Sequence, residues 1–148
     1  MNDICVNRKA RFDYEIIETH EAGMVLLGSE VKSLRNGNAN LRDSYAIVKG
    51  EEVFLINAHI AKYPPANIFN HDPTRTRKLL LKKLEIRRLT GKIKEKGLTL
   101  IPLKIYFNKD GVAKTEIGLA KGRRKYEKKE EIKKRDIERE IRSEKSRL

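Results

Sequence analysis

Residues 44–60 read SYAIVKGEEVFLINAHI, and they indicate two β-strands joined by a tight turn. Both halves are rich in Val, Ile, Tyr and Phe, which pack well on a pleated surface. Lys49, Gly50 and Glu51 stand between the halves, and glycine at such a tip is typical of a β-hairpin. The stretch therefore predicts an antiparallel sheet at the centre of the fold.

Strand-like sequence also precedes this hairpin. YEIIE at 14–18 and MVLLGSEVKSL at 24–34 predict two strands, with Ala22-Gly23 as a turn between them. Gly28 lies inside the second stretch, where it predicts a bulge or sharp bend of the kind that curls a sheet. A short helix around 31–36 is the alternative for the end of this stretch.

A loop, a helix and a second hairpin follow. Three prolines predict a loop over 63–78, and LKKLEIRRLTGKIKEKG at 81–97 predicts a helix that Gly97 ends. Its expected buried face comprises Leu84, Ile86, Leu89 and Ile93. LTLIPLKIYF at 98–107 and VAKTEIGLA at 112–120 predict two strands joined by a hairpin turn from Asn108 to Gly111.

These elements predict a mainly β fold, with about six antiparallel strands and one or more flanking helices. A closed or partly open barrel of the oligonucleotide-binding type fits best, since closure leaves no free sheet edge. A β-sandwich is the second alternative. We expect residues 1–121 to form this barrel domain and residues 122–148, here called the tail, to be a flexible basic extension.

The charge of the chain indicates a polyanionic partner. The 148 residues carry a net charge of +13, which favours nucleic acid. Residues 121–148 hold thirteen basic and seven acidic residues, a net charge of +6. An acidic membrane surface is a weaker alternative, because the tail has no broad apolar stripe. The sequence has no apolar run long enough to predict a membrane span or a signal peptide. We therefore expect a cytoplasmic protein.

Two stretches of the body suit RNA. Arg75 and Arg77 alternate in a stretch expected to be a polar loop, so they should project to one side and meet phosphates or bases. Near the N-terminus, cations stand beside Phe12 and Tyr14, as suits single-stranded or looped RNA. A solvated loop and a strand with core aromatics are the respective alternatives. The candidates are Asn7, Arg8, Lys9, Arg11, Phe12, Arg75, Arg77 and Lys78.

The tail is rich in Glu, Lys and Arg, which favour helix, and has acid-to-base pairs four residues apart. Ile137 and Ile141 form only a thin apolar seam, so we expect the tail to contribute no core. It should be disordered alone and helical along a polyanion. A permanently solvated tail that raises solubility is the alternative.

The sequence offers no constellation for catalysis, a metal or a cofactor. His20, His59 and His71 lack metal-ligand spacing, and Cys5 is the single cysteine. We therefore expect no enzyme. A nuclease would need clustered acids or an activated nucleophile, and neither is found.

Seven motifs in order resemble the SmpB family, the small protein B family of bacterial tmRNA-binding proteins. They are NRKARFDYEI, THEAG, GSEVKSLR, DSYA, DPTRTRKLLL, LxGKxxEKG and GLAKGRRKYEKK, and the match covers roughly residues 7–137. The resemblance implies an oligonucleotide-binding barrel with flanking helices. It also implies binding to the tRNA-like domain of tmRNA and its delivery, with elongation factor Tu, to ribosomes stalled on truncated mRNA. The alternative is a general RNA-binding or ribosomal structural protein.

The resemblance also implies individual site residues. Glu21 and Leu80 match tmRNA-binding positions, and Lys82 stands where the family usually has Asn or His. Phe12 stands where the family often has His. The tail would read the empty mRNA channel from the decoding site through Lys121, Gly122, Arg123, Arg124, Tyr126, Glu127, Lys128, Lys129 and Ile137.

Overall fold

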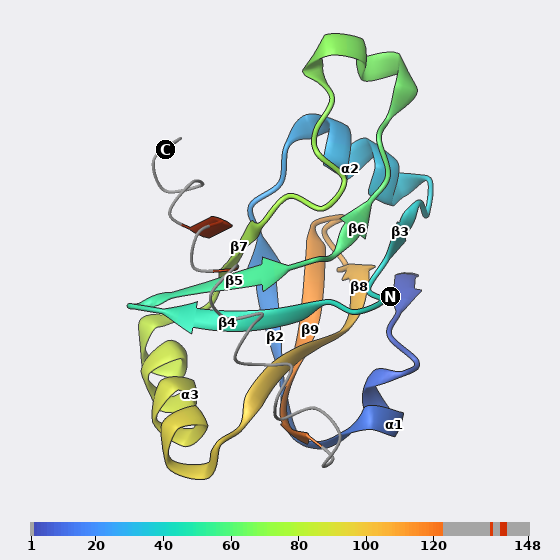
Figure 1. Cartoon of the computed structure of the whole chain (residues 1–148). Coiled ribbons are helices and arrows are strands. Elements are labelled where there is room, and N and C mark those ends of the chain that lie inside the picture. The colour runs from blue at the N-terminus through green and yellow to red at the C-terminus, as the bar shows by residue number, and fades with distance from the viewer. Residues whose placement is uncertain (1, 123–136, 138–139, 142–148) are drawn as a thin grey trace.

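Six antiparallel strands close into a ring in the computed structural model (Figure 1). The structure describes residues 2–122, 137, 140 and 141. In order around the ring, the strands are β8 (Thr99–Phe107), β4 (Tyr45–Lys49), β5 (Glu52–Ile56), β7 (Arg77–Leu80), β2 (Tyr14–Met24) and β9 (Ala113–Gly122), and β9 pairs again with β8. β1 (Asn2–Val6) pairs with the outer part of β8, and β3 (Ala39–Asn40) pairs with β6 (His59–Ile60). The predicted closed barrel is confirmed.

Both predicted hairpins are present. In the first, Lys49 pairs with Glu52, and Gly50 has a φ of 65° at the tip. In the second, β8 and β9 flank a turn in which Gly111 has a φ of 74°. Glycine occupies such left-handed conformations without the steric cost that a side chain adds. β9 runs to Gly122, two residues beyond the predicted end.

The prediction for residues 14–34 is wrong in two places. Ala22 and Gly23 lie inside the continuous strand β2 and do not form a turn. A Cβ at Gly23 would stand 3.3 Å from the Cβ of Leu80 on β7, so close packing explains this glycine. Gly28 begins helix α2 (Gly28–Arg35), whose first turn is fixed when Glu30 Oε1 accepts a hydrogen bond from the Leu27 N–H at 2.8 Å. The side chain of Glu30 thus favours a helix where periodicity suggested a strand. The alternative of a short helix around 31–36 is confirmed, and that helix begins earlier, at Gly28.

Two short helical segments and the predicted long helix complete the fold. They are α1 (Ala10–Asp13), the 3-10 segment η1 (Pro64–Phe69) and α3 (Lys83–Lys96). Gly97 caps α3 with a φ of 62°, as predicted. Ile86 and Leu89 are buried and Ile93 is partly buried, but Leu84 is exposed, so the predicted apolar face was one residue too wide.

The barrel interior is filled by aliphatic side chains from all six strands. Its most buried members include Ala22, Val53, Leu55, Leu79, Leu100, Ile105, Ile117 and Leu119. Helices α2 and α3 add Leu34, Ile86 and Leu89. This core holds the strands that carry the candidate site.

A second apolar cluster lies outside the ring. Phe54 and Ile56 of β5 pack there with Ile137 and Ile141, which are 4% and 0% exposed. The expectation that the tail contributes no core is therefore wrong for these two isoleucines. The physical reason is that β5 is apolar on both faces, so its outer face also needs cover.

Cys5 lies in β1 and is half-buried. Burial raises the pKa of its thiol to about 11. Among the described residues, no helix is long and apolar enough to span a membrane.

Candidate nucleic-acid interface

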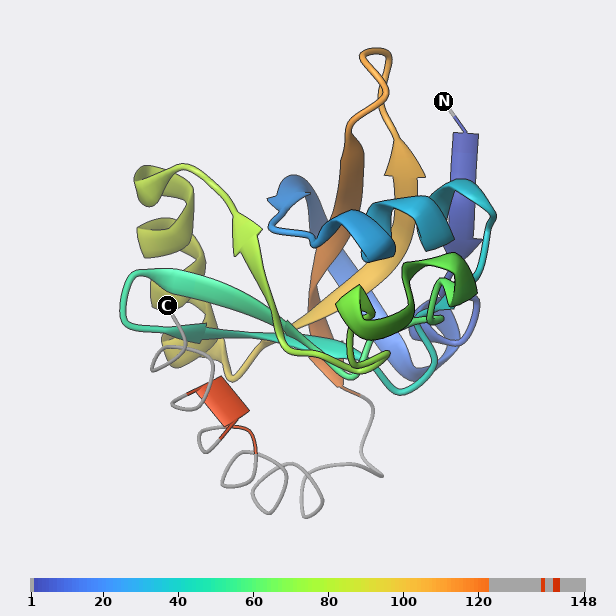
Figure 2. The same ribbon diagram turned by 90° about the horizontal axis from the view of Figure 1, so that it is seen from above.

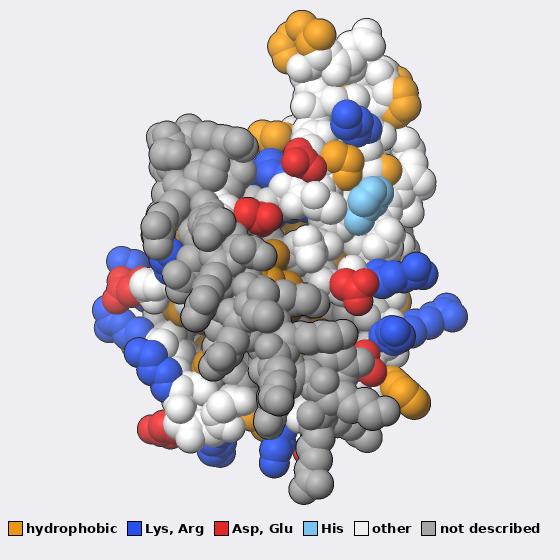
Figure 3. Space-filling model, in the orientation of Figure 1, with side chains coloured by type: hydrophobic (Ala, Val, Ile, Leu, Met, Phe, Trp, Pro, Cys, Tyr) orange, Lys and Arg blue, Asp and Glu red, His pale blue; other side chains and the backbone are white. Residues whose placement is uncertain are grey.

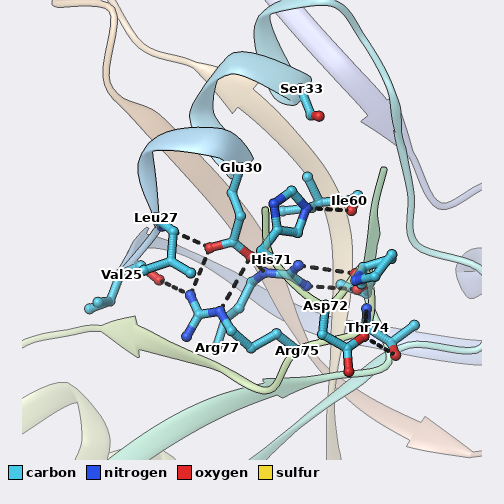
Figure 4. A network of polar contacts seen from close by, with 12 residues as sticks. Val25, Leu27, Glu30, Ser33, Ile60, His71, Asp72, Thr74, Arg75 and Arg77 are labelled. Atoms are coloured by element: carbon cyan, nitrogen blue, oxygen red, sulfur yellow. Dashed lines mark hydrogen bonds and ion pairs between the residues drawn. The ribbon is translucent and has the colours of Figure 1, made fainter. Parts of the chain in front are cut away.

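Glu30 is the centre of a buried polar network between α2 and β7 (Figure 4). Its carboxylate is 0% exposed and accepts hydrogen bonds from Arg75 Nη2 at 2.7 Å and from Arg77 Nε at 2.5 Å. Arg77 also donates to the carbonyl oxygens of Ala58 at 2.7 Å and Pro73 at 3.0 Å. The two arginines do point to one side, as predicted, but they point inward.

This geometry corrects the prediction for Arg77. Its side chain is fully buried in strand β7, whereas we expected a solvent-facing loop residue that contacts phosphate. Arg75 is partly exposed, at 15% of its side chain, and is also held by the Val25 carbonyl oxygen at 3.1 Å. Burial alone would raise the pKa of Glu30, but the hydrogen bond from Arg75 and the charge of Arg77 outweigh it and hold that pKa below its ordinary value.

His71 fixes the loop that leads to these arginines. Its Nε2 lies 2.8 Å from the Ile60 carbonyl oxygen, and its Nδ1 lies 2.7 Å from Ser29 Oγ. Because a carbonyl oxygen only accepts, Nε2 donates the hydrogen bond to Ile60, and the Ser29 hydroxyl is the partner of Nδ1. His71 is thus a structural residue that ties the loop to α2.

The N-terminal candidates are displayed outward by a short helix. Ala10 is buried under α1, and Asn7 anchors the segment by donating from Nδ2 to the Pro102 carbonyl oxygen at 2.9 Å. Arg8, Lys9 and Arg11 are exposed, and Phe12 is 79% exposed. Tyr14 instead packs on a cluster with Ile101, Leu103 and Ala120, as the alternative for that residue predicted. Within the described part of the chain, no carboxylate pairs with Arg8 or Arg11.

The first residue of the tail, Gly122, lies beside this basic segment. Tyr14, which directly follows α1, pairs with Gly122 at the end of β9, and Glu15 pairs with Lys121. Lys121 and Gly122 are both exposed. Their neighbours Arg123, Arg124, Tyr126, Glu127, Lys128 and Lys129 lie outside the described residues. Ile137 is described, and it is buried on the barrel.

Glu21, Leu80 and Lys82 lie towards the other end of β2. Gly23 pairs with Leu80, while Tyr14 marks the α1 end nine residues earlier. At ~3.4 Å per residue, the two groups are separated by ~30 Å. The structure therefore divides the predicted contacts between two ends of one strand, and a ligand that meets both must be extended.

Sequence reasoning missed Tyr106, which holds Glu21 in place. The Tyr106 hydroxyl donates a short hydrogen bond to Glu21 Oε2, and burial together with the Glu21 charge raises the pKa of Tyr106. Glu21 itself is exposed, as Leu80 and Lys82 are. Lys78 is half-buried and pairs with Glu52 at 3.2 Å. No sequence signal linked Tyr106 to Glu21, because they are 85 positions apart.

A second acidic centre joins β2 to α3. Glu18 accepts hydrogen bonds from His20 at 3.0 Å, from Lys92 at 2.9 Å and from Arg88 at 3.0 Å. The His20 and Lys92 hydrogen bonds lower the pKa of Glu18 to about 2. Two basic residues of α3, Arg88 and Lys92, are thus partly neutralised by the barrel.

The surface view shows where charge and apolar groups gather on one face (Figure 3). Lys and Arg side chains are spread around the edges of this face, and hydrophobic side chains stand at the tip of the loop that carries η1. Ile68 and Phe69 of that loop are 88% and 80% exposed. Among the described residues, no group of three or more His, Cys, Asp or Glu side chains could hold a metal ion.

Comparison with known proteins decides the family. The family model described as "SmpB protein" matches residues 4–147. The chain belongs to the SmpB family. SmpB-family relatives include an "SsrA-binding protein" of Symbiobacterium thermophilum, 56% identical over 93% of this chain and 87% of the relative. Another "SsrA-binding protein", from Moorella thermoacetica, is 58% identical over 91% of this chain and 87% of its own length.

A solved structure agrees with the SmpB assignment. The structure described as "tmRNA-SmpB: a journey to the center of the bacterial ribosome" is 55% identical, covers 83% of this chain and 86% of its own, and superposes with a TM-score of 0.68. The family expected from the seven sequence motifs is thereby confirmed.

Proposed function

We propose that this protein binds the tRNA-like domain of tmRNA and acts with it in trans-translation, on ribosomes stalled on truncated mRNA. The observation that carries the proposal is the 56% identity to an SsrA-binding protein over 93% of the chain. At that identity and coverage, the whole body rather than one motif is shared. Work on the ribosome implies a cytoplasmic protein, with elongation factor Tu as a further proposed partner in delivery.

The RNA-binding surface that we propose has two parts. Arg8, Lys9 and Arg11 supply exposed positive charge at the α1 end, and Phe12 supplies a ring on which a base can stack. At the other end of β2, Leu80 offers apolar contact and Lys82 a cation. Cations position RNA through its phosphates, and aromatic rings favour unpaired bases, so this surface suits a folded RNA with an open loop.

Glu21 has a distinct role in this proposal. An exposed carboxylate repels phosphate, so Glu21 is expected to accept hydrogen bonds from base or ribose donors. Tyr106 fixes the orientation of its carboxylate from below. Such a contact contributes selectivity, because a wrong RNA leaves the carboxylate facing phosphate.

For the tail, we propose entry into the empty mRNA channel of the small subunit, from a starting point beside α1 at Gly122. The body binds tmRNA and the tail detects that mRNA is missing. Ile137 and the basic residues from Arg123 to Lys129 are the proposed channel contacts.

Competition binding tests the RNA assignment. The labelled tRNA-like domain of tmRNA is bound to the full chain and challenged with unlabelled tRNA-like domain or with an unrelated folded RNA of equal length. We expect the unrelated RNA to compete at least about a thousandfold less well, which is the low end of ordinary specific-to-nonspecific ratios. Equal competition would favour the alternative, a general RNA-binding or ribosomal protein. The net charge of +13 is consistent with that alternative.

A truncation after Gly122 tests the division between body and tail. It should bind the tRNA-like domain nearly as well as the full chain, because α1, Glu21 and Leu80 remain. It should fail to support tag addition on stalled ribosomes. Full tagging by the truncated chain would contradict a role of the tail in the channel. Truncation also removes Ile137 and Ile141, which cover Phe54 and Ile56. Lys128→Ala with Lys129→Ala in the full chain is the matched control, because it keeps both isoleucines.

A further inference from the structure

The outer face of the β4–β5 hairpin is apolar although the barrel interior is already filled. Val53 and Leu55 point into the main core, and Phe54 and Ile56, which alternate with them along β5, point outward. Cross-strand pairing places Ile47 opposite Phe54 and Tyr45 opposite Ile56. These four side chains, Tyr45, Ile47, Phe54 and Ile56, form what we call the outer apolar face.

The cover of this face comes from the tail. Ile137 and Ile141 are buried against it, and residues 137, 140 and 141 are helical. A spacing of four residues puts both isoleucines on one side of a helix. Figure 2 shows the red segment of the tail beside the β4–β5 hairpin. The occupant of the outer apolar face is thus a segment of this same chain.

A hydrogen bond fixes the position of the tail segment. Thr76 Oγ1 donates to Glu140 Oε2 at 3.0 Å, and Thr76 is buried just before β7. Two apolar anchors and one directional polar contact define a register rather than a loose apolar collapse. The same contacts are few, so they can be broken by a competing partner.

We propose that the outer apolar face is a docking site for Ile137 and Ile141 in the free protein, and that the tail must leave it before acting in the mRNA channel. The second half rests on the proposed function. The reason is that Ile137 and Ile141 cannot contact the channel while they are buried against Phe54 and Ile56. Once released, a helix of 27 residues would reach ~40 Å.

The docked state offers a simple way to couple RNA binding to probing. With the tail docked, Ile137 is unavailable to other partners. Release of the tail exposes Phe54 and Ile56 to water, which is unfavourable. Contacts of the tail in an empty channel would offset this unfavourable free energy. An occupied channel offers no such contacts, so the tail would return to the barrel. Docking thereby makes the tail respond to vacancy rather than bind any RNA.

The first test uses the free full-length protein and no RNA. We expect nuclear Overhauser contacts between the methyl groups of Ile137 or Ile141 and the ring of Phe54. Phe54→Thr, on a strand where threonine is well tolerated, should speed amide exchange at Ile141 by about tenfold or more, because a large buried side chain is lost from the face. Absence of these contacts in the wild type would overturn the docking site.

A matched control distinguishes loss of docking from general loosening. Ile17→Thr replaces a half-exposed isoleucine of β2, away from the outer apolar face. It should leave exchange at Ile141 unchanged. An equal acceleration in both variants would mean that Ile141 reports barrel stability only, and the docking site would be wrong.

The second test locks the tail. Ile56→Cys with Ile141→Cys is joined by a short reducible bifunctional thiol reagent, and tag addition on stalled ribosomes is measured before and after reduction. Ile17→Cys with Ile141→Cys is the control pair. We expect the locked protein to bind the tRNA-like domain normally, to tag at least about tenfold less, and to recover on reduction, since the lock removes the released population.

Tagging by the locked protein at the reduced protein's rate would overturn the requirement for release. Failure of the proposed function would look different. The wild-type chain would then show no preference for the tRNA-like domain, while the contacts between Phe54 and the isoleucines, measured without RNA, would be unaffected.

Discussion

The arginines at the start of β7 and those around α1 look alike in the sequence and differ completely in the structure. Arg75 and Arg77 are turned inward onto Glu30, and Arg77 is 0% exposed. Arg8 and Arg11 stand on the surface beside an exposed Phe12. Both pairs occur in polar, basic stretches of about the same composition. Among the described residues, only the first pair has a carboxylate to meet.

The difference shows that a basic motif does not by itself tell whether its partner is another molecule. Glu30 lies 45 positions before Arg75 and in a different element, so no local pattern announces the pair. An ion pair inside a protein replaces hydration with fixed geometry, and its loss is costly. Exposed cations keep their hydration and remain available to phosphate. The first region thus uses its positive charge in folding, whereas the second keeps its charge available for the RNA contact proposed above.

The largest effect should follow from breaking the buried pair. Arg77→Ala leaves the buried Glu30 carboxylate with one arginine fewer and removes the hydrogen bonds to Ala58 and Pro73. We expect a loss of about 3–5 kcal/mol in the free energy of unfolding, measured by urea denaturation. Arg75→Ala should cost less, because Arg75 is partly exposed. A loss below about 1 kcal/mol for Arg77→Ala would contradict a structural role.

The exposed arginines should show the opposite behaviour. Arg8→Ala with Arg11→Ala should leave the free energy of unfolding within about 0.5 kcal/mol of wild type, as at most surface positions. Binding to the tRNA-like domain should weaken, and the slope of log K against log salt should flatten by about 1.4–1.8 for two lost phosphate contacts. An unchanged slope would place these arginines away from RNA. The measurement is a salt titration of binding.

The partly exposed network around Glu18 should have an intermediate effect on the free energy of unfolding, and that effect should depend on pH. Glu18 has its pKa lowered from 4.5 to about 2 by His20 and Lys92, so its charge stabilises the fold fully above pH 4.5. That contribution is lost as pH falls towards 2. The difference in unfolding free energy between wild type and Glu18→Gln should therefore shrink steadily from pH 5 to pH 2. A constant difference over that range would rule out a contribution from the ionised carboxylate.

The smallest effect is expected at the most exposed ion pair. Arg87 and Glu51 approach to 3.1 Å, but their side chains are 64% and 55% exposed. Solvent screens such a pair, and surface pairs usually contribute between 0 and about 1 kcal/mol. Arg87→Ala should change the urea midpoint by little or nothing. A loss as large as that of Arg77→Ala would mean that burial does not distinguish the two pairs.

The elements that local chemistry controls were predictable from the sequence. Gly50, Gly97 and Gly111 were placed correctly at turns or a helix end, and each has a positive φ. The hairpins and α3 followed from these glycines and from apolar periodicity. The closed ring then followed from the number of strands and the need to satisfy sheet edges.

The errors arose where a distant residue decides the outcome. Gly23 reads as a turn residue until Leu80 is found 3.3 Å from where its Cβ would be. Gly28 reads as a bulge until Glu30 fixes the first turn of α2. Ile137 and Ile141 form too thin a seam for a core by themselves, and they become core only because β5 is apolar on its outer face. Of the candidate site residues, Arg8, Lys9, Arg11 and Phe12 are exposed, as contact with RNA requires. The family resemblance supplied Glu21, Leu80 and Lys82, and the RNA contacts of all these residues stay a prediction.

The lone cysteine has a practical consequence for fluorescence and spin-label work. With its pKa raised to about 11 by burial, Cys5 has only ~0.01% of its thiol ionised at pH 7, against a few per cent for an ordinary exposed thiol. Reagents that attack the thiolate should therefore modify an introduced surface cysteine far faster than Cys5. Probes can be attached to the tail or to α1 in the otherwise unaltered chain, and the β1–β8 edge of the barrel keeps its native packing while the tail is followed.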